Sequence, residues 1–134
     1  MEKAAVRKAL VVDDERDARE FVKAILEPMG WDVAEAWDGA SGLKEAKAVK
    51  PELIILDVQM PNSNGFEVFS DLARDPETSG AKVIMLTGVA EKTGLHFSAK
   101  EMGEFLGKEP DGYAEKPIDP ESFKRVVKKV MGGK

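Results

Sequence analysis

The stretch Leu53-Ile54-Ile55-Leu56-Asp57 consists of four apolar residues closed by a carboxylate. Similar apolar runs occur at Ala9–Val12, directly before Asp13, and at Val83–Leu86, directly before Thr87. Each run is far shorter than the about 20 apolar residues that a membrane span needs. Short apolar runs separated by segments of helical periodicity are typical of a parallel sheet with helices on both faces. We therefore expect an α/β fold.

The same patterns place the remaining elements. Five strands are predicted, at Ala9–Val12, Asp32–Ala36, Leu53–Leu56, Lys82–Leu86 and Gly112–Glu115. Apolar residues spaced three and four apart predict helices at 18–29, 40–49, 65–73, 98–107 and 120–130. Asp119 is the expected N-cap of the last helix. The expected architecture is a doubly wound, five-stranded parallel sheet in the flavodoxin-like order 2-1-3-4-5, with helices on both faces.

Length and charge exclude several classes of protein. The 134 residues suit one domain, and the absence of cysteine excludes a disulfide framework and a Cys-ligated zinc site. With 20 basic and 25 acidic residues, the net charge is −5, which argues against nucleic acid or an anionic membrane as a partner. There is no signal-peptide h-region, so we expect a soluble cytoplasmic protein.

Carboxylates follow two strands that the expected order makes neighbours. Asp13 and Asp14 follow the first strand, and Asp57 follows the third. In such sheets, sites lie beyond the carboxyl ends of the strands, where the strand order reverses. Clustered carboxylates repel one another unless a hard cation such as Mg²⁺ binds between them. Alternatively, Asp13 or Asp14 only caps the first helix, and Asp57 only opens a turn.

Two more polar side chains follow the fourth and fifth strands. Thr87 would supply a hydroxyl and Lys116 an ammonium group to the same crevice. With the three carboxylates, this combination suits a phosphoryl group. Taken singly, Thr87 is equally explained as a turn residue and Lys116 as a solvated surface charge.

Combined motifs identify a family. They are Leu10-Val11-Val12-Asp13-Asp14, Leu53-Ile54-Ile55-Leu56-Asp57 followed by Met60-Pro61 and Gly65, Val83-Ile84-Met85-Leu86-Thr87-Gly88, and Tyr113-Ala114-Glu115-Lys116-Pro117. The sequence resembles the receiver domain of two-component response regulators, most closely the stand-alone kind typified by the chemotaxis receiver. We expect a single receiver domain over residues 1–134, with its core at about 8–131 and no output domain.

The resemblance implies a role for each site residue. Asp57 would be the phosphoacceptor, a nucleophilic carboxylate that receives a phosphoryl group from a sensor histidine kinase, a phosphotransfer protein or a small acyl phosphate. Asp14 and Asp57, with the backbone carbonyl of Gln59, would ligate Mg²⁺, and Asp13 would act through a metal-bound water. Lys116 would hold a phosphoryl oxygen. Such a protein catalyses its own phosphorylation and slow dephosphorylation, rather than working as a conventional turnover enzyme.

The resemblance also implies a conformational switch. Thr87 would move toward the phosphoryl group and Tyr113 would turn inward behind it; otherwise Tyr113 is a half-buried aromatic on the edge strand. A downstream protein target would dock near the fourth helix, fifth strand and fifth helix. The 28 residues between Thr87 and Lys116 (positions 88–115) are more than the family usually has. Within them, Phe97 and Phe105 indicate either an altered docking surface or ordinary packing.

Two other functions stay open. A phosphatase of the haloacid dehalogenase type also forms an aspartyl phosphate. That family has a second Asp two residues after the nucleophile, where this chain has Gln59. A degenerate receiver would serve only as a binding module, although all the expected site residues are present. Phe21 in the first helix, and Trp31 and Trp37 beside the second strand, are expected to be packing residues.

Overall fold

A five-stranded parallel sheet forms the centre of the molecule. The computed structural model describes residues 7–60, 63–87 and 110–132. The strands are β1 (Arg7–Val12), β2 (Trp31–Ala36), β3 (Leu53–Asp57), β6 (Lys82–Thr87) and β7 (Gly112–Glu115). Their order across the sheet is β2-β1-β3-β6-β7. The predicted order 2-1-3-4-5 is therefore confirmed.

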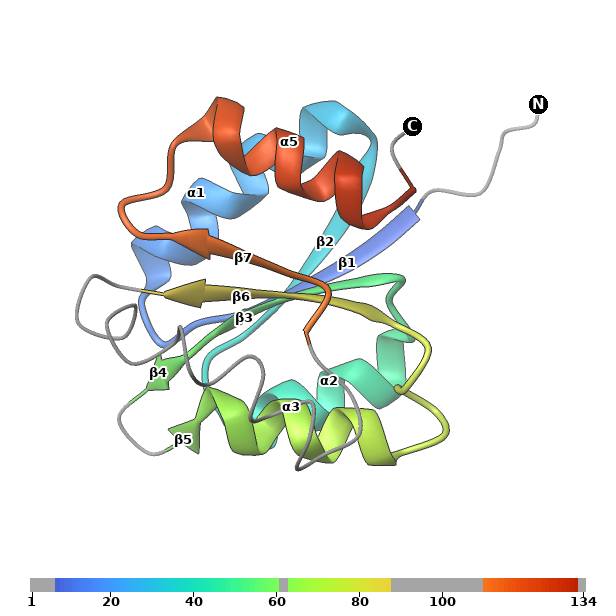
Figure 1. Cartoon of the computed structure of the whole chain (residues 1–134). Coiled ribbons are helices and arrows are strands. Elements are labelled where there is room, and N and C mark those ends of the chain that lie inside the picture. Colours follow the sequence, from blue (N-terminus) through green and yellow to red (C-terminus); the bar gives the residue numbers. More distant parts are fainter. Residues whose placement is uncertain (1–6, 61–62, 88–109, 133–134) are drawn as a thin grey trace.

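Helices cover both faces of this sheet, as expected (Figure 1). On one face lie α1 (Arg16–Leu26) and α5 (Pro120–Val130), and on the other lie α2 (Gly39–Val49) and α3 (Gly65–Arg74). A short antiparallel pair, β4 (Gln59–Met60) and β5 (Ser63–Asn64), was not predicted and lies beside the carboxyl end of β3. The predicted fourth helix, with Phe97 and Phe105, falls outside the described residues.

Each central strand contributes side chains to two separate hydrophobic cores. Along β1, Leu10 and Val12 pack on the α2/α3 side, whereas Ala9 and Val11 pack on the α1/α5 side. The residues of β3 alternate in the same way, and Leu53–Leu56 are all fully buried. Successive side chains of a strand point to opposite faces, so a sheet covered on both faces needs an unbroken apolar run. This burial explains the apolar runs of the sequence.

The first helix is shorter than predicted. It ends at Leu26, and Glu27–Met29 form a 3₁₀ turn that closes at Gly30, whose φ is 100°. Proline at 28 suits the start of this turn, because it fixes φ and needs no backbone donor there. Glycine adopts the left-handed conformation at position 30 without the cost that a β-carbon would add.

Two of the three aromatic packing predictions were wrong. Trp31 is 5% exposed and buried as expected, with the Arg7 guanidinium carbon 4.7 Å from the centre of its ring. Phe21 is 42% exposed, because the side of α1 that faces the sheet carries Val22, Ile25 and Leu26. Trp37 is 59% exposed, since it follows the last residue of β2 and so lies beyond the covered part of the sheet.

Side chains cap two of the helices. Asp119 caps α5 as predicted, because its carboxylate accepts a hydrogen bond from the backbone N–H of Ser122. At the start of α2, Asp38 and Ser41 form a reciprocal capping box that the sequence analysis missed. Among the described residues, no helix is both long enough and apolar enough to cross a membrane.

Candidate metal centre

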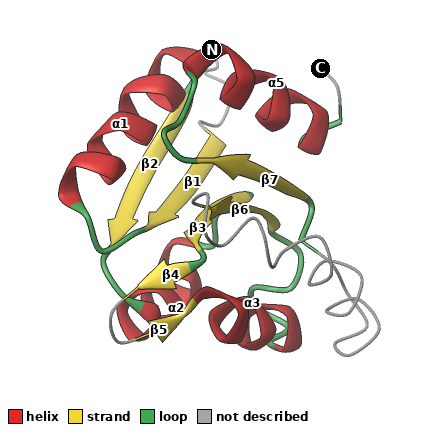
Figure 2. Cartoon of the chain, turned by 60° about the vertical axis from the view of Figure 1, so that its left-hand side comes forward, coloured by secondary structure: helices red, strands yellow, loops and turns green. Residues whose placement is uncertain are grey.

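The predicted site residues gather at the carboxyl edge of the sheet. In the sheet register, Val12 pairs with Leu56, so Asp13 and Asp57 follow at the same level of neighbouring strands. Asp57 pairs with Leu86, the residue before Thr87, and Thr87 pairs with Glu115, the residue before Lys116. Residues far apart in the sequence are thus brought to one edge of the sheet, where the strands β1, β3, β6 and β7 end (Figure 2).

Three carboxylates converge at this edge. One oxygen atom from each of Asp13, Asp14 and Asp57 lies within 4.8 Å of the other two. Asp13 is fully buried and Asp57 is 5% exposed, whereas Asp14 is exposed. Buried carboxylates need compensating charge, and hard divalent cations prefer oxygen ligands of this kind. The residues present therefore fit a divalent metal ion.

Asp13 is held in place from four directions. Its backbone N–H donates to the Ala36 carbonyl at 3.1 Å, and its carbonyl oxygen accepts from Arg19 at 2.8 Å. Its Oδ1 accepts from the backbone N–H of Glu15 at 2.9 Å, and its Oδ2 lies 3.0 Å from Nζ of Lys116. The residue at the N-cap position of α1 is Glu15, so neither Asp13 nor Asp14 is the simple helix cap considered as an alternative.

Lys116 is the cation of the cluster. Its Nζ lies 3.0 Å from Asp13, 3.5 Å from Asp57 and 3.9 Å from Glu15. Burial acts to lower the pKa of Lys116, but the hydrogen bond with Asp13 and the nearby negative charges outweigh it, so the pKa lies above its usual value. Lys116 is therefore protonated, and it is not the solvated surface charge of the alternative interpretation.

The strand ends also fix Thr87 and Tyr113. The hydroxyl of Thr87 is buried and donates to the carbonyl of Ala114 at 3.5 Å, and the Lys116 N–H donates to the Thr87 carbonyl at 2.7 Å. The peptide bond between Lys116 and Pro117 is cis. Tyr113 is half-buried on β7, packs against the α2/α3 core and has a buried hydroxyl oxygen. The switch roles of Thr87 and Tyr113 stay predictions.

Gly65 sets the position of the Asp57 backbone from the opposite side. A β-carbon at position 65 would lie 2.4 Å from the Asp57 carbonyl oxygen and 2.7 Å from Cα of Val58. The Gly65 N–H donates to the Val58 carbonyl at 2.8 Å. The chain therefore folds back onto Asp57 at a distance that only glycine permits. Gly65 belongs to one of the motifs of the sequence, but its role at the site was not predicted.

Three further residues around the site were missed by the sequence analysis. Glu15 reaches Lys116, while Arg19 and Glu35 form an ion pair of 2.9 Å behind Asp13. The sequence signal that could have found Glu35 is its charge, because the other residues of β2 after Asp32 are apolar. Arg19 lies three residues before Val22 and seven before Leu26, on the side of α1 that faces the sheet, so a charge at this apolar spacing was the signal that could have found it.

Comparison with known proteins identifies the family. A family model described as the response regulator receiver domain matches residues 9–128. The chain therefore belongs to the response regulator receiver domain family.

Several known proteins are similar to this chain in sequence or in structure. Protein PilH of Pseudomonas aeruginosa is 32% identical over 124 residues, which cover 92% of this chain and 97% of PilH. The alkaline phosphatase synthesis transcriptional regulatory protein PhoP of Bacillus subtilis is 36% identical over 125 residues, but this chain spans only 48% of that protein. The chemotaxis response regulator CheY4 of Vibrio cholerae superposes with a TM-score of 0.79 at 28% identity, covering 94% of this chain and 99% of CheY4. This chain is thus a phosphorelay response regulator domain.

Proposed function

We propose that Asp57 is the residue of this receiver domain that accepts the phosphoryl group. The observation that carries the proposal is the environment of its carboxylate, which is 5% exposed, ends β3, and lies 3.5 Å from the Lys116 ammonium with two further carboxylates nearby. A carboxylate held beside a cation at the end of a buried strand can act as a nucleophile, because the cation stabilises the negative charge that develops on the phosphoryl oxygens.

The reaction we propose is a phosphoryl transfer. An Asp57 carboxylate oxygen attacks phosphorus, and the bond from phosphorus to the donor breaks: the P–N bond of a phosphohistidine or the P–O bond of an acyl phosphate. The departing imidazole or carboxylate keeps the bonding electrons, and Asp57 becomes an aspartyl phosphate. Lys116 would then hold one phosphoryl oxygen as a point charge.

Mg²⁺ is the proposed cofactor. Asp14 and Asp57 would hold it directly with the backbone carbonyl of Gln59, and Asp13 would hold it through water. The support is the set of hard oxygen ligands: Asp13, Asp14 and Asp57 place oxygen atoms within 4.8 Å of one another, and Lys116 pairs with two of the three residues. When bound, the ion supplies charge neutralisation on the phosphoryl oxygens.

The proposed partners lie on both sides of the phosphorylation step. A sensor histidine kinase or a phosphotransfer protein would donate the phosphoryl group. The hydroxyl of Thr87 would then turn from the Ala114 carbonyl toward the new charge, with Tyr113 packing behind it. A downstream protein would read this change near β7 and α5 and near the predicted fourth helix. The cytoplasmic location and the absence of an output domain stay predictions.

The experiment that tests this function is labelling with acetyl phosphate. In the presence of Mg²⁺, the intact mass of the wild-type protein is expected to increase by one phosphoryl group, and EDTA should prevent the increase. The variant Asp57→Asn should stay unlabelled, while Asp32→Asn, which changes an exposed residue of β2, should label normally. Undiminished labelling of Asp57→Asn would overturn the assignment.

The alternative functions are not favoured. A haloacid dehalogenase type of phosphatase does not fit a chain that matches the receiver model over residues 9–128. A degenerate binding module would be expected to have lost site residues, whereas Asp13, Asp14, Asp57 and Lys116 are all present and close together.

A further inference from the structure

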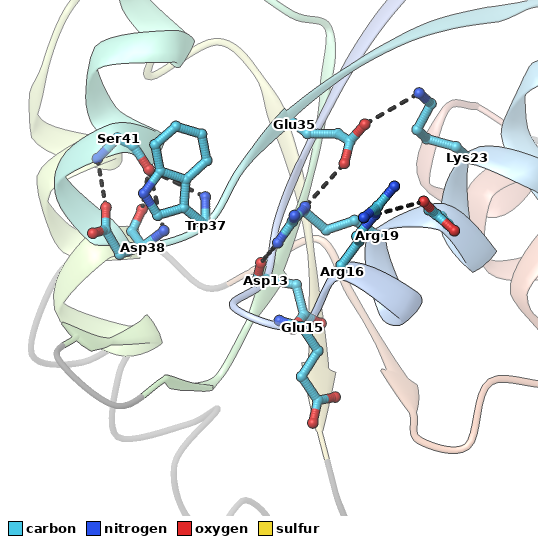
Figure 3. Close-up of polar contacts among 10 residues, drawn as sticks. Asp13, Glu15, Arg16, Arg19, Lys23, Glu35, Trp37, Asp38 and Ser41 are labelled. Atoms are coloured by element: carbon cyan, nitrogen blue, oxygen red, sulfur yellow. Dashed lines mark hydrogen bonds and ion pairs between the residues drawn. The ribbon is translucent and has the colours of Figure 1, made fainter.

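Arg19 connects three parts of the protein behind the acidic cluster. From the first half of α1, its guanidinium donates to the Asp13 carbonyl oxygen at 2.8 Å and to Oε1 of Glu35 on β2 at 2.9 Å (Figure 3). Its own backbone N–H donates to the Glu15 carbonyl at 3.1 Å. The loop that carries Asp13 and Asp14 is therefore held by Arg19 at its first and last residues.

The contact with the Asp13 carbonyl fixes more than one residue. This carbonyl belongs to the peptide unit that joins Asp13 to Asp14, and a peptide unit is planar. Fixing the position of its oxygen therefore sets the orientation of this peptide plane, and with it the position of the Asp14 Cα. Asp14 is exposed, whereas the Asp13 carboxylate has its own contacts with Glu15 and Lys116. Asp14 thus depends most on this backbone contact for its direction.

The arrangement needs an arginine and an anchor. The side chain of Arg19 is 14% exposed, and only the planar fork of a guanidinium can donate to two acceptors on different sides in a fixed geometry. Glu35 holds the other side of the fork, and its second oxygen accepts from Nζ of Lys23 at 3.1 Å. The pKa of Glu35 is raised by burial but lowered more by Arg19 and Lys23, so it stays ionised.

We propose that Arg19 is a positioning residue for the metal centre, which orients the Asp13–Asp14 peptide by anchoring it to Glu35. The proposal rests on the proposed function, since it assumes that Mg²⁺ binds at the three carboxylates. Arg19 contacts neither the ion nor the phosphoryl group in this account. It acts on metal affinity through the backbone, as residues that orient ligands do in other metal sites.

The test is calorimetric titration of the purified chain with MgCl₂. Arg19→Lys keeps the charge but loses the fork, and the Kd for Mg²⁺ is expected to rise on the order of 10-fold. Glu35→Gln keeps the shape of the anchor but loses its charge, and should raise the Kd in the same direction. The matched control is Arg16→Lys, in the same helix, whose side chain is 79% exposed and pairs with Glu20 at 3.0 Å. It should leave the Kd unchanged.

Two accompanying measurements separate positioning from folding. At saturating Mg²⁺, the acetyl phosphate labelling rate of Arg19→Lys should return toward that of the wild type, because only metal affinity is impaired. A lowered Tm with an unchanged Kd would show a purely structural role and overturn the proposal. If Arg19→Lys does not fold, Glu35→Gln decides the question by the same criterion.

The outcome also distinguishes this proposal from the proposed function. If the wild type binds Mg²⁺ and Arg19→Lys weakens it while Asp57→Asn is still labelled, Arg19 keeps its role and the assignment of Asp57 fails. A wild type that binds no Mg²⁺ would overturn both.

Discussion

At the scale of single residues, the site combines groups that are unfavourable without a ligand. Asp13, Asp14 and Asp57 place oxygen atoms within 4.8 Å of one another, and the ammonium of Lys116 contacts the two buried ones. Like charges this close repel one another. The fold holds them through the contacts of Asp13 with Glu15, Ala36 and Arg19. The cluster is therefore compatible with a bound cation, whose charge would offset this repulsion.

Because of this repulsion, we expect Asp14→Asn to have opposite effects with and without metal. Asp14→Asn removes an exposed charge from the cluster, so in EDTA its Tm should equal or exceed that of the wild type. Mg²⁺ at 100 times its Kd should add about 2.7 kcal/mol to the unfolding free energy of the wild type and so raise its Tm. It should have little effect on the variant. Thermal melts with and without MgCl₂ check this.

The control for that experiment is Asp32→Asn, which removes an exposed carboxylate on β2. It should respond to Mg²⁺ like the wild type. A full response of Asp14→Asn to Mg²⁺ would mean that the ion binds elsewhere.

Gly65 gives a prediction about backbone contact. In Gly65→Ala the new methyl group would overlap the Asp57 carbonyl oxygen, which is backbone and cannot rotate away. We expect a loss of about 1–3 kcal/mol in the free energy of unfolding, together with slower labelling of Asp57. Gly80→Ala is the matched control, because a β-carbon there meets nothing within 4 Å, and its effect should stay within about 0.5 kcal/mol. Urea denaturation of both variants measures the difference; equal stabilities would refute the close contact.

The site residues whose clustering the sequence could predict are those that stand at strand ends. Asp13, Asp57, Thr87 and Lys116 were found because strand ends in a parallel sheet meet at one edge. Arg19 and Glu35 were missed because their partners depend on how α1 crosses β2, and no periodicity in the sequence describes that crossing. The backbone role of Gly65 was missed for a similar reason, since it depends on the distance between two segments.

At the scale of elements, each helix is held by a few buried side chains. Phe123 of α5 is 1% exposed and lies in the α1/α5 core, whereas Phe21 of α1 is 42% exposed. Phe123→Ala should cost about 3–5 kcal/mol of unfolding free energy, because it leaves a cavity. Phe21→Ala should cost clearly less. Chemical denaturation of the two variants compares them, and similar losses would contradict the orientation of α1.

The ion pair between α1 and β2 predicts a dependence on pH. Hydrogen bonds from Arg19 and Lys23 outweigh burial and keep the pKa of Glu35 below its usual value of 4.5. A carboxylate with a lowered pKa contributes stability above the pKa of the unfolded state and loses it as the pH falls through the folded pKa. Glu35→Gln should therefore lose less stability than the wild type as the pH falls below 4.5. Urea midpoints across this range measure it; parallel curves would contradict it.

Most elements were predictable because burial on both faces leaves a strong pattern. The strand predictions agree with the structure to within two residues at each end; for example, β1 begins at Arg7 rather than Ala9. The less accurate predictions concern positions where the covering layers stop. Trp37 follows the end of β2 and is exposed, and the last turn of α1 changes to a 3₁₀ turn before Gly30. An apolar residue at such a boundary carries no signal of whether another element covers it.

At the scale of the whole molecule, the site exists only when the sheet is complete. Asp13 follows β1, Asp57 ends β3 and Lys116 follows β7. These strands are distant in the sequence, and β6 lies between β3 and β7 in the sheet. The proposed metal binding and phosphorylation at this edge would therefore depend on the packing of both helical layers (Figure 1). A change at Asp57 can reach β7 through Thr87, whose hydroxyl contacts the Ala114 carbonyl.

The central claim is that Asp57 carries the phosphoryl group. The most direct test is to treat the wild-type protein with acetyl phosphate, reduce the acyl phosphate with borohydride and map the modified residue by peptide mass spectrometry. We expect modification at Asp57 alone, dependent on Mg²⁺ and lost in EDTA. Modification at another residue, or equal modification of Asp57 in EDTA, would contradict the account.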